Sequence, residues 1–138
     1  DSGVVPVKIG PVTRLLRVDE IRSVNSCENY TEVTLKAGEH FLVRRTMQQW
    51  GETLRGVQFA RVHRNLIVNV AHIERVERGS AETARVHFAG GSPALDVSRR
   101  HAPELRAKLR LWETERSQRA AAEQAGQDNS RHSQQDSA

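Results

Sequence analysis

Short segments in which polar and apolar residues alternate dominate residues 4–97. Alternation with a period of two places the apolar side chains on one face of a β-strand. The clearest example is 30–36, which is followed by the turn Ala37-Gly38-Glu39 and by the apolar segment 41–43. Residues 30–44 are therefore predicted to form a β-hairpin. Repetition of such segments between turn-forming residues predicts a mainly β fold.

The same pattern predicts about ten short strands in small sheets. Glycine, proline, serine and asparagine mark the turns between the strands. Pro6 in the first segment indicates an edge strand, because proline cannot donate a hydrogen bond to a central ladder. The other strands are expected at 4–9, 12–18, 21–25, 59–62, 66–70, 73–78, 83–88 and 94–97.

One internal segment has helical spacing instead. Met47, Trp50 and Leu54 would form a single apolar stripe on a short helix. Thr46 and Gln49 have the spacing of a capping box at the start of that helix. This stripe is expected to pack into the core.

A C-terminal helix is expected after Ser98, which can cap it, with leucines and Trp112 as its apolar stripe. The following residues, 113–138, contain no Val, Ile, Leu, Phe or Trp. A segment without apolar anchors cannot bury enough surface to fold. We therefore expect one domain over 1–112 and a polar, disordered C-terminal tail over 113–138.

The charge follows this division. Residues 1–112 contain 18 Lys and Arg against 12 Asp and Glu, a net charge of +6, whereas 113–138 carry a net charge of −2. A basic folded region rich in arginine favours an anionic partner. Cys27 is the only cysteine, so no internal disulfide is expected and the reducing cytoplasm is the predicted location. No apolar run is long enough to span a bilayer.

Catalytic, metal and cofactor sites are not predicted. The six histidines are scattered, without the spacing of metal ligands. Glycine-rich phosphate-binding loops and the Gly-x-Ser-x-Gly nucleophile motif do not occur in the sequence. We therefore expect a protein that is not an enzyme and needs no cofactor or metal.

Basic and polar residues gather instead at several boundaries between predicted elements. Guanidinium, hydroxyl and amide groups are the donors and acceptors that bind phosphates and base edges. Arg44-Arg45 lies where helix N-terminal amides would also favour a phosphate. The candidate binding residues are Asn29, Tyr30, Thr31, Arg44, Arg45, His63, Arg64, Asn65, Ser98, Arg99 and Arg100.

These segments, taken in order, resemble the LytTR family of DNA-binding domains, the output domains of many bacterial response regulators. The resemblance covers about 110 residues, and its most specific parts are the strings His63-Arg64-x-x-x-Val68-Asn69 and Val97-Ser98-Arg99-Arg100. The supporting strings are Asp19-Glu20-Ile21-Arg22-Ser23-Val24, Glu28-Asn29-Tyr30-Thr31-Glu32-Val33 and Phe41-Leu42-Val43-Arg44-Arg45-Thr46-Met47.

The resemblance implies an elongated domain of about ten strands that inserts loops into successive major grooves and bends the duplex. The loops would be 29–31, 63–65 and 98–100, with Arg64 and Arg99 as the main base-reading residues. His63 could instead brace its loop, and Asn69 is expected to fix a turn. The implied function is transcription regulation at paired promoter sites, with an upstream receiver domain or another copy of the chain as a partner.

The residues alone leave alternatives open. The basic surface could serve RNA or another anionic partner in an interaction module without sequence-specific DNA recognition. RNA-binding domains usually expose several aromatic residues for stacking, and Tyr30 is the single aromatic residue in the predicted loops.

Overall fold

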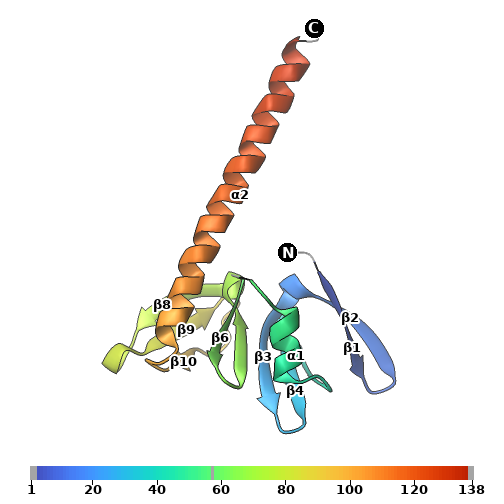
Figure 1. The fold of residues 1–138 in the computed structure, drawn as a ribbon, viewed down its shortest axis with the longest axis vertical. Coiled ribbons are helices and arrows are strands. Elements are labelled where there is room, and N and C mark those ends of the chain that lie inside the picture. Colours follow the sequence, from blue (N-terminus) through green and yellow to red (C-terminus); the bar gives the residue numbers. More distant parts are fainter. Residues whose placement is uncertain (1–2, 57, 137–138) are drawn as a thin grey trace.

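A computed structural model describes residues 3–56 and 58–136, with side chains as far as Gly126. Ten strands within these residues form three antiparallel sheets (Figure 1). The mainly β fold expected from the sequence is confirmed. The strands are β1 (Val4–Ile9), β2 (Val12–Arg17), β3 (Ile21–Cys27), β4 (Tyr30–Leu35), β5 (His40–Val43), β6 (Phe59–His63), β7 (Leu66–Asn69), β8 (Ile73–Arg78), β9 (Ala84–Phe88) and β10 (Leu95–Val97).

Two α-helices and three short 3-10 turns complete the described part of the chain. The helices are α1 (Met47–Thr53) and α2 (Ala102–Asp136), and the 3-10 turns are η1 (Val18–Glu20), η2 (Val70–His72) and η3 (Ser80–Glu82). The predicted capping box is present, because Gln49 N–H donates to Thr46 Oγ1 and Thr46 N–H donates to Gln49 Oε1.

A five-stranded sheet with the order β5-β4-β3-β7-β6 lies at the centre of the fold. The β1–β2 hairpin lies on one side of it, and the sheet β10-β9-β8 lies on the other side (Figure 1). The three sheets therefore follow one another along the molecule rather than closing into a barrel.

The two faces of the β6–β7 hairpin belong to different hydrophobic cores. Phe59 and Ile67 pack with the buried residues of β1–β4 and with Trp50 of α1. Ala60 and Val68, which alternate with them, pack against β8–β10 and the first turns of α2. Because consecutive strand residues point to opposite faces, this hairpin joins both cores through its period-two pattern.

Asn69 fixes the end of β7, as the sequence predicts. Its side chain is fully buried, Nδ2 donates to the Ile21 carbonyl at 2.8 Å, and Oδ1 accepts from Ala71 N–H at 2.9 Å. Buried amides are stable only when their polar atoms are paired. The residue thus ties η2 to the start of β3.

Helix α2 differs from the sequence prediction. Its first turns pack through Ala102 and Leu105 against β6 and η2, as expected of the C-terminal helix. It then continues to Asp136, where a disordered tail was predicted from Glu113, and it projects away from the sheets (Figure 1). Side chains 113–126 are all exposed, so the division between a packed domain over 1–112 and a polar extension remains a prediction.

No helix among the described residues is both long enough and apolar enough to cross a membrane.

We predict that the free energy of unfolding decreases as the pH drops below about 6.5, the ordinary pKa of histidine. His72 is one cause of this decrease. Desolvation by burial lowers the pKa of His72, and its Nε2 lies 2.7 Å from the Asp19 carbonyl. Between the unfolded and the lowered folded pKa, the unfolded chain binds more protons, so the free energy of unfolding decreases as the pH falls. Denaturant unfolding of the wild type and of His72→Gln from pH 7.5 to 5 should give a shallower slope for the variant. Equal slopes would contradict this role.

Candidate nucleic-acid interface

Two hairpin turns lie at the same end of the five-stranded sheet, and the β10–α2 junction of the neighbouring three-stranded sheet lies beside them. The β3–β4 turn follows the pair Cys27–Tyr30, and the β6–β7 turn lies next to it because Asn25 pairs with Leu66. Ser26 N–H donates to the Asn65 carbonyl at 2.8 Å and links the two turns directly. We call this end of the sheet, with the adjoining β10–α2 junction, the turn end.

The β6–β7 turn is braced by its own residues. Asn65 N–H donates to His63 Nδ1 at 3.2 Å, and the Arg61 guanidinium donates to the Arg64 carbonyl. Since His63 Nδ1 accepts a hydrogen bond, the neutral ring carries its proton on Nε2. The predicted bracing by His63 is present, while the Arg64 and Asn65 side chains remain exposed.

The β10–α2 junction meets this turn in space. The Ser98 carbonyl accepts from His101 N–H at 3.0 Å and from Ala102 N–H at 2.9 Å, which closes the turn that precedes α2. The rings of His63 and His101 lie edge to face with centroids 6.2 Å apart. A groove of about 450 Å³ between the two segments is lined by His63, Arg64, Arg100 and His101.

Arg99 lies in a different groove from Arg64. A second groove of about 230 Å³ is lined by Arg78, Glu82, Arg99, Pro103 and Arg106. Arg100 rather than Arg99 therefore shares a groove with Arg64. The sequence does not indicate this, because Arg78 and Arg106 reach Arg99 only through the folding of β8 and α2.

The residues predicted to bind at the β3–β4 turn differ in their exposure to solvent. Glu28 has a left-handed backbone with φ of 53°, and Asn29 and Tyr30 are exposed. Thr31, by contrast, is only 2% exposed. Its hydroxyl accepts from Trp50 Nε1 at 2.8 Å and donates to the Arg45 carbonyl at 2.9 Å.

Thr31 is therefore a structural residue, and its assignment to the reading loop is corrected. The alternation of β4 turns this side chain toward the core, where its hydroxyl pairs a buried indole N–H with a backbone carbonyl.

Arg44 and Arg45 directly follow the end of β5, and their side chains make different contacts. The Arg44 guanidinium lies over the Tyr30 ring, 5.6 Å from its centroid, and Nη2 donates a long hydrogen bond of 3.5 Å to the Tyr30 hydroxyl. That hydrogen bond raises the pKa of Arg44. Arg45 is half-buried, stacks 4.9 Å above Trp50 and donates to Thr53.

Helix α1 follows these arginines, and its capping box pairs the N–H groups of Thr46 and Gln49. A phosphate at its N-terminus could not use these two N–H groups.

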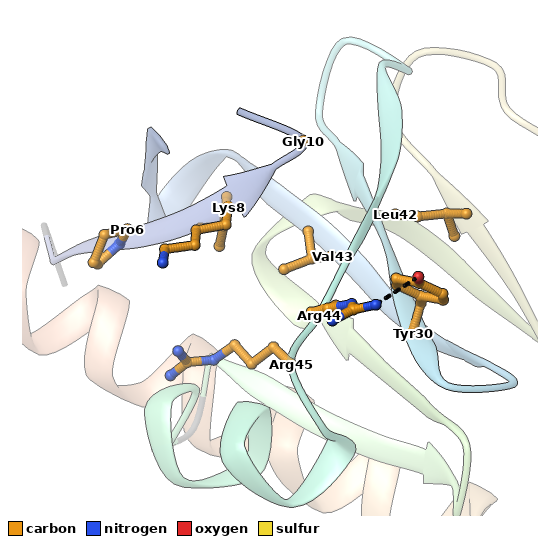
Figure 2. A pocket seen from close by; sticks show the side chains of 9 residues that line it. Pro6, Lys8, Gly10, Tyr30, Leu42, Val43, Arg44 and Arg45 are labelled. Carbon is orange, nitrogen blue, oxygen red and sulfur yellow. Dashed lines mark hydrogen bonds between the residues drawn. The ribbon is translucent and has the colours of Figure 1, made fainter. Parts of the chain in front are cut away.

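Lys8 of β1 lies near these arginines, and the sequence analysis missed it. A groove of about 530 Å³ lies between β1 and the end of β5 (Figure 2). The residues lining it are Pro6, Val7, Lys8, Gly10, Tyr30, Leu42, Val43, Arg44 and Arg45. An isolated lysine in an edge strand carries no signal that would connect it to residues more than 30 positions away.

Among the described residues, no three His, Cys, Asp or Glu side chains are grouped as metal ligands.

We predict that Thr31→Val destabilises the fold by about 1–3 kcal/mol, because it leaves the Trp50 N–H and the Arg45 carbonyl without their partner. Thr34→Val, on the opposite and half-buried face of the same strand, is the matched control and should change stability much less. Chemical denaturation measures both; equal effects at the two positions would contradict the assignment.

Comparison with known proteins agrees with this architecture. The sequence model of the LytTr DNA-binding domain matches residues 12–110. Among solved structures, the fold is similar to the LytTr DNA-binding domain of a methyl-accepting/DNA response regulator from Bacillus cereus. That similarity has a TM-score of 0.67 at 23% identity and covers 79% of this chain and 97% of that one. No curated protein sequence matches the chain significantly. Because the family match spans most of the sequence, the chain belongs to the LytTR family of DNA-binding domains.

Proposed function

We propose that the chain binds double-stranded DNA in a sequence-specific manner through the turn end, as part of a transcriptional regulator. The observation that carries this proposal is the meeting of the β3–β4 turn, the β6–β7 turn and the β10–α2 junction at one end of the molecule. Segments separated by up to about 70 residues in the sequence thereby present exposed arginine, asparagine and histidine side chains together.

The spacing of these segments suits a duplex. The centres of the two hairpins are two strands apart in the sheet order, or about 10 Å at the usual interstrand spacing of about 4.8 Å. A major groove about 12 Å wide admits one such turn. Two turns about 10 Å apart would enter the same stretch of major groove, because successive major grooves on one face of a duplex are about 34 Å apart. Insertion of loops into successive major grooves, with bending of the duplex, stays a prediction from the family resemblance.

The exposed groups have the chemistry of base recognition. Arg64 and Arg99 are the proposed principal readers, since a guanidinium can donate two hydrogen bonds to guanine. Arg100 lines the groove of Arg64, and His63 Nε2–H is a further donor there. Asn29 and Asn65 carry amides of the type that pairs with adenine. Arg44 and Ser98 are better suited to phosphate contacts.

A regulator of this type acts by binding and not by catalysis. The chain is proposed to be the output domain of a response regulator, as the similar domain from Bacillus cereus is named. An upstream receiver domain or a second copy of the chain would then control occupancy of paired sites, in the cytoplasm.

Selection of bound sequences from random duplexes by the purified chain tests the function. A recurring sequence motif is expected, and the selected duplex should bind much more tightly than a scrambled one at the same salt concentration. Recovery of no motif, or equal affinity for single-stranded RNA, would contradict the proposal.

We predict that Arg64→Ala and Arg99→Ala each weaken binding to the selected duplex by about 1–3 kcal/mol while changing binding to a scrambled duplex much less. Arg44→Ala should weaken both by similar factors, because a phosphate contact does not depend on sequence. Fluorescence anisotropy at fixed salt measures these affinities.

The matched control is Arg116→Ala. Arg116 lies on the exposed part of α2, which projects away from the turn end, and pairs with Glu113 (Figure 1). The Arg116→Ala variant should bind both the selected and the scrambled duplex with wild-type affinity. Loss of both affinities by the same factor in Arg64→Ala and Arg99→Ala would exclude base recognition by these residues.

A further inference from the structure

We propose that the groove between β1 and the end of β5 binds a backbone phosphate in the DNA flanking the recognition site, with Lys8 as its key cation. This inference rests on the proposed function and extends it to a strand that the family match does not include. The match begins at Val12, whereas β1 spans Val4–Ile9.

The groove has two walls from distant parts of the sequence. Pro6, Val7 and Lys8 of β1 form one wall, and Leu42 to Arg45 form the other (Figure 2). Tyr30 lies at the edge nearest to the β3–β4 turn. The groove therefore continues the turn end instead of forming a separate surface.

The charge of the lining favours an anion. Lys8, Arg44 and Arg45 are cations, and none of the nine lining residues is acidic. Three positive groups around an open groove without a carboxylate have no internal compensation, so a phosphate would gain their attraction without displacing an ion pair.

Two of the cations are already held in place. Arg44 contacts Tyr30, and Arg45 is stacked on Trp50 and bonded to Thr53. Side chains ordered before binding lose less conformational freedom when a ligand arrives. Lys8 is exposed and adds a mobile point charge from the opposite wall.

A duplex is a better occupant than a small free anion. The groove lies beside the β3–β4 turn, so DNA held at the turn end would place its flanking backbone near Lys8. Leu42 and Pro6 also present exposed apolar surface beside the cations, which could contact deoxyribose.

The test compares Lys8→Ala with the wild type on a long selected duplex. Loss of one phosphate contact should lower the slope of log affinity against log salt by about 0.9 and weaken binding roughly fivefold at 0.15 M salt. Lys8→Arg should restore both values. Lys36→Ala is the matched control, because Lys36 is an exposed lysine at the opposite end of the sheet, after β4, and it should behave as the wild type.

Shortening the duplex locates the contact. Removing base pairs from the flank beside the groove should weaken the wild type by the same factor as Lys8→Ala, and should not weaken the variant further. If the groove is instead a site for free anions, inorganic phosphate at constant ionic strength should bind to the wild type but not to Lys8→Ala, while flank length has no effect; that result would overturn the proposal.

Failure of this inference differs from failure of the proposed function. If Lys8→Ala keeps wild-type affinity and salt slope while Arg64→Ala loses specific binding, the groove has no phosphate contact and the turn end still recognises DNA. If the wild type selects no recurring duplex sequence, the proposed function and this inference both fail. Circular dichroism and thermal unfolding check that the Lys8 variants are folded.

Discussion

Pairing of β3 with β7 is the interaction on which the rest of the structure depends. β3 belongs to one hairpin and β7 to another, and their antiparallel register brings Asn25 opposite Leu66. The hydrogen bond from Ser26 N–H to the Asn65 carbonyl continues this contact to the turns. A slip of one residue in this register would exchange the two faces of the strand and would also separate the turns. The same pairing therefore determines both the sheet and the turn end.

The two cores hold this surface from both sides. The β6–β7 hairpin contributes alternate residues to each core, so neither core can form completely without it. On one side, the chain of hydrogen bonds from Trp50 through Thr31 to the Arg45 carbonyl fixes the exit of β5 and thus the position of Arg44. On the other side, the Ser98 carbonyl accepts two backbone hydrogen bonds that close the turn between β10 and α2. The segments that carry the exposed arginines are thereby anchored to the cores, which limits the entropy lost on binding.

Local patterns predict much of this structure. The alternation in 30–36, the capping box at Thr46 and the turn fixed by Asn69 depend on neighbours in the sequence, and all three are present. Properties that depend on distant residues are not predictable in this way. Thr31 is a polar residue next to a predicted loop, yet β4 directs its side chain toward Trp50. Arg99 lies beside Arg78 and Arg106 only after folding. Lys8 and Arg44 line the same groove from different strands. Helix α2 continues beyond Trp112 without an apolar stripe, which no core-based pattern could indicate.

Chemical-shift mapping of the backbone amides on addition of the selected duplex tests the central claim most directly. Large changes should occur at the turn end, in 28–30, 63–65 and 98–101, and at the adjoining residue 44. The opposite end, including the β4–β5 turn at 36–39, should change little, as should the exposed part of α2. Large changes confined to the β4–β5 turn or to α2, with the turn end unaffected, would contradict the account.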